Sequence, residues 1–130
     1  MIKELGILLT GGAGCIGSNL VRALLDTEPE RIVAIDDLSA PYEWNLPKDP
    51  RMSFIRESIL DEERARRAFS FKPHFVFHLA AHFANQNSVD HPETDLLVNG
   101  LGTSRVLGYT HLCGVERFFF ASSGCSIYGS

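Results

Sequence analysis

The sequence predicts an α/β fold built on a doubly wound parallel sheet. Two observations predict it: short apolar runs alternate with helix-like segments along the chain, and a glycine-rich turn joins the first apolar run to the first helical segment. Strands that alternate with helices form parallel sheets with right-handed crossovers. We expect the strand order 3-2-1-4-5, with ligands bound at the carboxyl ends of the strands where the order reverses.

Length and composition restrict the class of protein. The chain has 130 residues, and we expect residues 1–130 to form one domain. A hydrophobic content of 45% predicts a packed core, and a formal net charge of −4 argues against a nucleic-acid partner or a membrane surface. No apolar run is long enough to cross a bilayer and no signal peptide precedes the first strand, so we expect a cytoplasmic protein.

Cysteine and histidine spacing gives no sign of a metal site. The three cysteines, Cys15, Cys113 and Cys125, have neither disulfide-framework nor metal-ligand spacing. The five histidines show no zinc-site spacing with them. The sequence therefore predicts no metal, and a reducing compartment fits the odd number of thiols.

The first half of the chain contains three expected strands and two expected helices. The strands are short and apolar, and the second is apolar on both faces, as a buried parallel strand requires. The second helix begins with Asp61, Glu62 and Glu63, acids that the helix dipole stabilises. In chain order, these elements are expected at residues 2–10, 15–26, 31–36, 52–56 and 61–69.

The second half continues with a fourth strand at 73–78, a long helix at about 92–113 and a fifth strand at 117–121. The fifth strand carries three consecutive phenylalanines, and a strand this apolar normally has a neighbour on each side. We expect the sheet to be truncated after this strand. The truncation leaves an apolar edge that more chain or a partner should cover.

The glycine-rich turn has the composition of a phosphate-binding loop. Gly11 permits a tight turn out of the strand, Gly14 lets a phosphate approach the backbone, and Gly17 allows close packing of the helix on the sheet. The backbone N–H groups of Cys15 and Ile16, at the positive end of the helix dipole, suit a pyrophosphate. These features predict a Rossmann-type fold, and the alternative is a glycine-rich turn without a ligand.

Asp36 ends the second strand, 19 residues after Gly17. A carboxylate at this point accepts hydrogen bonds from an adenosine ribose diol. It also repels a 2′-phosphate, so the sequence predicts NAD rather than NADP. The alternative is an acid in an ordinary strand-end turn.

Five stretches of the chain form one pattern, each at the end of an expected strand or within the long helix. They are the glycine motif at 10–18, the turn Asp36-Asp37-Leu38-Ser39, the fourth-strand motif Phe77-His78-Leu79-Ala80-Ala81, the helix motif Asn99-Gly100-Leu101-Gly102-Thr103, and Ser122-Ser123 with Tyr128-Gly129. In these stretches, and over essentially its whole length, the sequence resembles the extended short-chain dehydrogenase/reductase family, especially its NAD-dependent nucleotide-sugar epimerases and dehydratases.

The resemblance implies a role for each of these stretches. The family removes hydride from a sugar carbon to NAD while a tyrosinate takes the hydroxyl proton. Asn99 corresponds to the family's active-site asparagine, and Ser123 or Ser126 would hydrogen-bond the substrate hydroxyl. Asn99 also counts among the implied cofactor contacts. The others are Gly11, Gly14, Cys15, Ile16 and Gly17 for the pyrophosphate, Asp36, Asp37, Leu38 and Ser39 for the adenosine ribose, Ser58 and Ile59 for adenine, and Leu79, Ala80 and Ala81 on the nicotinamide side.

The sequence departs from the family pattern at several positions. Cys15 stands where an aromatic residue is usual, Asp37 where Asn is common, and Ser58 where the family usually has Asp. Gly124 occupies the position of the catalytic Ser or Thr, and the family's Tyr-x-x-x-Lys pair does not occur in the chain. We therefore expect the N-terminal part of a longer enzyme, without its C-terminal sugar-binding part and inactive by itself.

The departures leave other functions open. The first alternative is a non-catalytic dinucleotide-binding module, acting as a redox sensor or a partner subunit. The second is a 4,6-dehydratase, although Gly124-Cys125-Ser126 does not match the Thr-Asp-Glu of that subgroup. For the leading function the expected partner is a nucleotide-sugar substrate, and a homodimer of the full-length form is left open.

Overall fold

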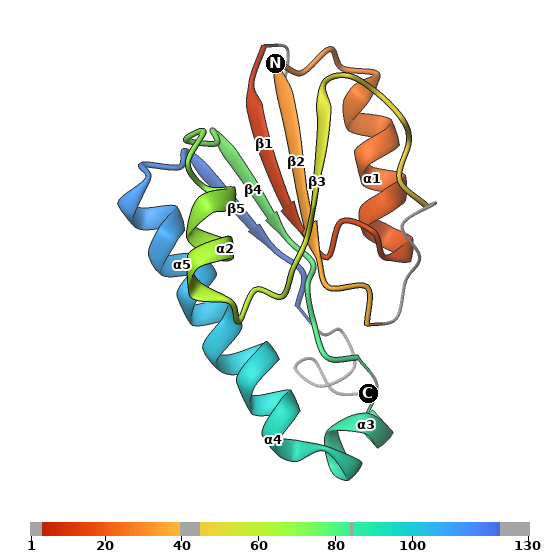
Figure 1. Cartoon of the computed structure of the whole chain (residues 1–130), viewed down its shortest axis with the longest axis vertical. Coiled ribbons are helices and arrows are strands. Elements are labelled where there is room, and N and C mark those ends of the chain that lie inside the picture. The colour runs from red at the N-terminus through yellow and green to blue at the C-terminus, as the bar shows by residue number, and fades with distance from the viewer. Residues whose placement is uncertain (1–3, 40–44, 84, 123–130) are drawn as a thin grey trace.

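A computed structural model describes residues 4–39, 45–83 and 85–122 of the chain. They form a five-stranded, wholly parallel sheet in the order β3-β2-β1-β4-β5 (Figure 1). The fold class and the strand order predicted from the sequence are thus confirmed. The strands are β1 (Gly6–Thr10), β2 (Arg31–Asp36), β3 (Met52–Arg56), β4 (Phe75–His78) and β5 (Arg117–Phe120).

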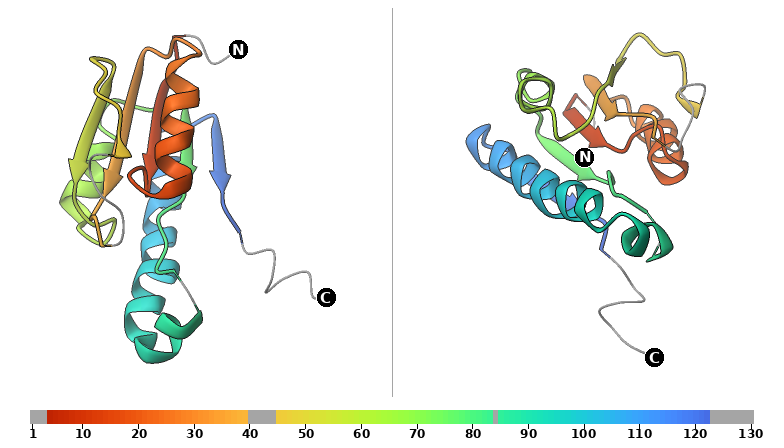
Figure 2. Two further views of the ribbon diagram at one scale, coloured as in Figure 1. Left: turned by 90° about the vertical axis from the view of Figure 1, so that its right-hand side faces the viewer. Right: turned by 60° about the horizontal axis from the view of Figure 1, so that its bottom comes forward.

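Helices cover both faces of the sheet. Figure 2 shows α1 on one side and the long helical path that ends in α5 on the other. Successive residues of β1 point to opposite faces of the sheet. Ile7 and Leu9 therefore pack towards α1, whereas Leu8 packs in the core formed with α2 and α5. The helices are α1 (Cys15–Leu25), α2 (Glu62–Ala68), α3 (Asn85–Asp90), α4 (Pro92–Asp95), the π-helical segment η2 (Leu96–Gly102) and α5 (Thr103–Leu112).

Several boundaries differ from the sequence prediction. The first strand begins at Gly6 rather than residue 2, because Glu4 adopts a left-handed φ of 63° in a turn and its N–H donates to the Glu28 carbonyl. The fourth strand starts at Phe75 and the fifth ends at Phe120, so both are shorter than expected. Asp61 lies outside α2 as its cap, and its carboxylate accepts the Arg64 N–H at 2.8 Å.

The long helix expected at 92–113 is continuous but not uniform. Its middle third, η2, has π-helical hydrogen bonding, and an additional short helix, α3, precedes it. At the end of η2, Gly102 packs so closely on Ile59 that a Cβ would lie 2.6 Å from the Ile59 Cδ1. The helical path therefore lies directly against the segment that follows β3. None of the helices in the described part of the chain combines the length and apolar character needed to span a bilayer.

The strand β5 forms one edge of the described sheet. Phe119 is 44% exposed and Phe120 is 56% exposed, although Phe119 stacks on Phe77 with ring centroids 4.5 Å apart. Phe75 contacts Phe119 edge-on from the same face. Phe75 and Phe77 pack against the core cluster that includes Val21 and Leu24 of α1, whereas Phe119 on the edge strand is not part of that cluster. The position of β5 at the edge of the sheet is seen in Figure 1.

His78 joins three elements from inside the sheet. Its ring is 1% exposed and stacks between Phe118 and Phe120. The Nδ1 atom lies 2.6 Å from the Thr10 hydroxyl at the end of β1, and Nε2 lies 2.9 Å from the Thr103 hydroxyl at the start of α5. Burial lowers the pKa of His78 to about 4, so the ring is neutral near pH 7.

We expect His78 to make the fold sensitive to acid. Because its folded pKa lies below the unfolded value of about 6.5, the unfolded state binds more protons, and stability falls as the pH drops from about 6.5 to 4. The loss amounts to about 3 kcal/mol at most. Urea unfolding between pH 7.5 and 4.5 should show a smaller pH dependence for His78→Gln than for the unsubstituted chain. His111→Gln, at an exposed position, is the control, and equal slopes for His78→Gln and the unsubstituted chain would contradict the assignment.

Candidate functional site

A cleft of about 260 Å³ lies at the carboxyl ends of the strands, where the order reverses between β1 and β4. It extends from the end of β2, past the glycine turn, to the segment after β4. Ligands of doubly wound sheets bind at this position. Most of the residues predicted for the cofactor line it, namely Gly11, Gly14, Asp36, Asp37, Ser39, Ser58, Ile59, Leu79, Ala80 and Ala81.

A side chain would have a different effect at each of three glycines of the turn. Gly11 has a left-handed φ of 69°, and a Cβ there would lie 2.6 Å from the Ala80 nitrogen. A Cβ on Gly17 would lie 2.2 Å from the Gly11 carbonyl oxygen, so the close approach is to the turn itself rather than to the body of the sheet. At Gly14 the nearest atom is 3.3 Å away, and this glycine faces the cleft. The backbone at Gly14 is therefore accessible to a ligand.

The start of α1 offers unpaired backbone donors. Gly14 is the N-cap and supplies no side-chain cap, and the first turn contains no acidic residue. The first N–H groups of the helix consequently have no intrahelical partner and lie at the positive end of its dipole. The side chains of Cys15 and Ile16 are exposed, so only their backbone is placed to contact an anion at this turn. This arrangement suits a phosphate.

Asp36 connects the end of β2 to the glycine turn. Its Oδ2 accepts the Ala13 N–H at 3.0 Å, and its Oδ1 accepts the Leu38 N–H at 2.9 Å. Burial raises the pKa of Asp36, against the lowering effect of the Leu38 and Ala13 N–H groups. Each carboxylate oxygen keeps acceptor capacity for a further donor. The side chain of Asn45 fixes the same turn by donating to the Ala13 carbonyl at 3.1 Å.

Two side chains follow β3 at the same end of the cleft. The Ser58 hydroxyl oxygen accepts the Leu60 N–H at 3.2 Å, which leaves its proton available to a ligand acceptor. Ile59 is buried beneath Gly102 and forms an apolar wall. Asp37 is exposed, and its carboxylate accepts the Ser39 N–H at 2.9 Å.

Asn99 holds the segment that follows β4. Its Oδ1 accepts the His82 N–H at 2.8 Å, and its Nδ2 donates to the His82 carbonyl at 3.1 Å. The same amide donates to Asp95 at 2.7 Å, and Asp95 also accepts the Ser88 hydroxyl at 2.8 Å. Asn99 projects from the π-helical segment η2, and π-helical turns are frequent at functional sites. Its side chain therefore fixes backbone beside the cleft rather than lining the cleft.

Six residues that line the cleft were not among the predicted cofactor contacts: Ile35, Glu57, His82, Phe83, Thr94 and Val98. Thr94 and Val98 are four residues apart on the helical path, so the helical periodicity around Asn99 was the available signal. The Nε2 atom of His82 is buried without a hydrogen-bond partner among the described residues, which is unusual for a polar atom. The predicted residues that do not line the cleft are Cys15, Ile16, Gly17, Leu38 and Asn99, and Ser123 and Ser126 lie outside the described residues.

A family model described as the NAD dependent epimerase/dehydratase family matches residues 7–130. The chain belongs to this family. The UDP-glucose 4-epimerase of Mycolicibacterium smegmatis is 39% identical over 126 residues, which cover 95% of this chain and 40% of that protein. The chain spans about 40% of the length of such relatives.

Solved structures of epimerases superpose closely on the chain. An epimerase from Methanothermobacter thermautotrophicus is 53% identical with a TM-score of 0.95, covering 98% of this chain and 38% of that one. The UDP-glucose 4-epimerase of Thermus thermophilus, solved as a complex with NAD, is 39% identical with a TM-score of 0.87, covering 97% of this chain and 40% of that one. This chain thus corresponds to part of an epimerase/dehydratase fold.

The residues of the cleft fit the cofactor that the family description names. The open side of Gly14 and the uncapped start of α1 suit two linked phosphates. Asp36, with acceptor capacity remaining, suits a ribose diol at the end of β2. The cleft therefore offers one chemically matched position for each half of an adenosine diphosphate group.

We expect the close packing at Gly17 to be sensitive to a single methyl group. Gly17→Ala places a Cβ against the Gly11 carbonyl and should lower the free energy of unfolding by roughly 3 kcal/mol. Gly108→Ala is the matched control, because nothing lies within 4 Å of its Cβ and helix propensity alone should stabilise it by about 0.5–1 kcal/mol. Urea unfolding measures both variants, and changes of the same sign would contradict the packing argument.

Proposed function

We propose that this chain is the N-terminal, NAD-binding domain of a nucleotide-sugar epimerase or dehydratase. The observation that carries the proposal is the position of Asp36, which faces the cleft while its carboxylate holds the glycine turn through Ala13. Family membership supports it, as does the NAD complex of the Thermus thermophilus relative. Within the longer protein, residues 1–130 would form the cofactor domain and a following part would bind the sugar.

In this proposal, each part of the cofactor is assigned to residues in or beside the cleft. The N–H groups of Cys15 and Ile16, beside Gly14, would bind the pyrophosphate, and Asp36 and Asp37 would accept from the adenosine ribose. Adenine would lie between Ile59 and the free hydroxyl proton of Ser58. The Leu79-Ala80-Ala81 segment would line the nicotinamide side.

The whole protein would oxidise and then re-reduce a sugar carbon, for which bound NAD supplies a reversible hydride acceptor. Asn99 is the positioning residue of this proposal, since its amide fixes the backbone of His82 beside the cleft. Ser123 or Ser126 would hydrogen-bond the substrate hydroxyl. A UDP-sugar is the substrate class, by similarity to the UDP-glucose 4-epimerases. A cytoplasmic location and a homodimer of the longer protein stay predictions.

We expect Asp36 to select NAD over NADP. Isothermal titration calorimetry should show NAD binding to the unsubstituted chain and weaker NADP binding, because the carboxylate repels a 2′-phosphate. Asp36→Asn should lower NAD affinity about tenfold by weakening charge-assisted hydrogen bonds, and should narrow the preference for NAD. Asp26→Asn, at the far end of α1, makes the same charge change outside the cleft and should leave both affinities unchanged. Tighter binding of NADP than NAD, or binding of neither, would overturn the assignment.

Residues 1–130 alone should bind NAD without epimerising UDP-glucose. The chain has Gly124 where the family's hydroxyl residue stands and no Tyr-x-x-x-Lys pair, so a base for the hydroxyl proton is missing. Proton NMR of UDP-glucose incubated with the chain and NAD measures C4 epimerisation directly. Turnover by these residues alone would contradict the prediction. The same Gly124 favours a non-catalytic dinucleotide-binding module, which a Tyr-x-x-x-Lys pair encoded after residue 130 would exclude.

A further inference from the structure

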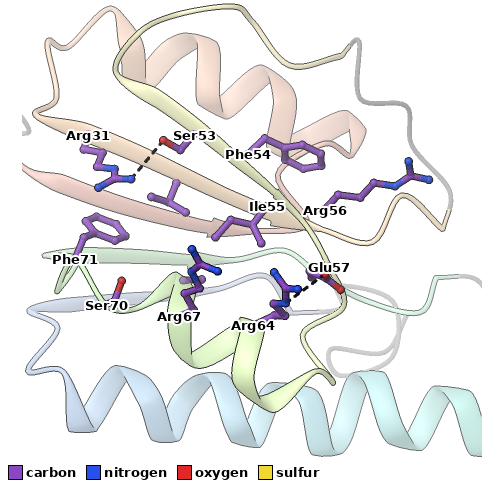
Figure 3. A pocket seen from close by; sticks show the side chains of 12 residues that line it. Arg31, Ser53, Phe54, Ile55, Arg56, Glu57, Arg64, Arg67, Ser70 and Phe71 are labelled. Atoms are coloured by element: carbon purple, nitrogen blue, oxygen red, sulfur yellow. Dashed lines mark hydrogen bonds and ion pairs between the residues drawn. The ribbon is translucent and has the colours of Figure 1, made fainter.

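A second cleft, of about 580 Å³, lies between the edge strand β3 and helix α2 (Figure 3). It shares only Glu57 with the candidate cofactor cleft, and the proposed function gives it no role. Among the described strands, β3 is paired only with β2, so its outer edge borders this cleft without a neighbour. We call this second cleft the arginine groove.

The arginine groove concentrates positive charge on an acidic protein. Arg31, Arg56, Arg64 and Arg67 line it, against one carboxylate, Glu57. The whole chain has 12 Lys and Arg residues against 16 Asp and Glu residues. A third of its cationic side chains therefore surround one groove, although the formal net charge is −4.

These guanidinium groups are only weakly engaged by the protein. Within the described part of the chain, the side chain of Arg67 makes no hydrogen bond or ion pair. Arg64 lies 3.6 Å from Glu57 in an ion pair whose side chains are 48% and 36% exposed, and such pairs contribute little. Arg31 lies over the Phe71 ring, 5.4 Å from its centroid, and reaches the Ser53 hydroxyl only at 3.5 Å. The N–H groups of three arginines thus remain available to a ligand.

The side chains converge from two elements. Figure 3 shows Arg64 and Arg67 extending from α2 towards β3, with Arg31 and Phe71 at one end of the groove and Glu57 beside Arg64. Arg56 points away from the other three, so it contributes charge rather than a direct contact. Between the arginines lies an apolar floor that includes Val33, Ile55 and Ala68.

We propose that the arginine groove binds a small phosphorylated ligand that carries two or more negative charges. Planar guanidinium groups bind phosphate oxygens through paired N–H donors, and three of them exceed the one carboxylate present. The apolar floor and the Phe71 ring accept the uncharged body of such a ligand, and the volume lies in the range of small-molecule sites. A peptide of acidic residues alone would engage the arginines but has no apolar side chain for the floor.

The test uses pyrophosphate as the probe and the 130-residue chain labelled with ¹⁵N. Titration at constant ionic strength should produce saturable shifts in the Nε–H signals of Arg31, Arg64 and Arg67. Arg67→Gln should weaken binding about tenfold, because it removes a charge-assisted contact. Arg66→Gln is the matched control: it makes the same charge change on the preceding residue of α2, outside the groove, and should alter the affinity by less than about twofold.

The variant Glu57→Gln should change the affinity for pyrophosphate in the opposite direction. It removes the only carboxylate that lines the groove, so pyrophosphate should bind more tightly, by roughly threefold or more. A loss of affinity in this variant would show that the probe does not lie beside Arg64, and would overturn the proposal.

Other outcomes also decide against the arginine groove. If Arg67→Gln and Arg66→Gln weaken pyrophosphate binding equally, the affinity depends only on the net charge of the chain. Shifts confined to the backbone of residues 11–17 would place pyrophosphate only at the glycine turn. If hexaglutamate binds more tightly than pyrophosphate, the ligand of the groove is an acidic peptide and not a small phosphorylated molecule. NAD binding is measured separately, at the glycine turn. If pyrophosphate does not bind the arginine groove, the proposed function is unaffected. If NAD does not bind the glycine turn, the proposal for the arginine groove is unaffected.

Discussion

The structure depends on a contact between two glycines. Helix α1 begins directly at the end of β1 because Gly17 packs on the Gly11 carbonyl at a distance that no Cβ permits. This contact brings the positive end of the helix to the edge of the sheet where the strand order reverses. Asp36 then fixes the turn from the neighbouring strand by accepting the Ala13 N–H. The turn that leads into the positive end of α1 and the carboxylate at the end of β2 are thus parts of one hydrogen-bonded unit.

A second set of contacts connects the other half of the cleft to the same turn. The Thr10 hydroxyl, one residue before Gly11, contacts both His78 and the Ala80 N–H. Through Nε2, His78 reaches Thr103, just after the π-helical segment that carries Asn99. Asn99 in turn holds the backbone of His82. These hydrogen bonds therefore connect both ends of the cleft to the end of β1.

The sequence allowed prediction wherever a short stretch determines its own structure. The strand order and the location of Asp36 follow from local alternation and from a spacing within one β-α-β unit. The close contact of Gly102 with Ile59, at the end of the π-helical segment, could not be foreseen, since it joins residues from separate elements. The role of His78 also depends on partners distant in the chain, Thr10 and Thr103. The arginine groove likewise brings together Arg31 of β2 and Arg67 of α2, which are far apart in the sequence. In the sequence, the residues next to each of them indicate only an ordinary charged surface.

The two clefts use different physical means to attract anions, and the difference follows from their surroundings. No Lys or Arg from the described residues lines the cofactor cleft, where Asp36, Asp37 and Glu57 are the charged groups. A cation placed there would pair with Asp36 and compete with a ribose diol for the carboxylate. Backbone N–H groups and the dipole of α1 attract a phosphate without that competition. The arginine groove lacks such a helix start and depends on full charges, which salt screens strongly at exposed positions. Anion binding should therefore weaken with rising salt much more steeply in the groove than in the cofactor cleft.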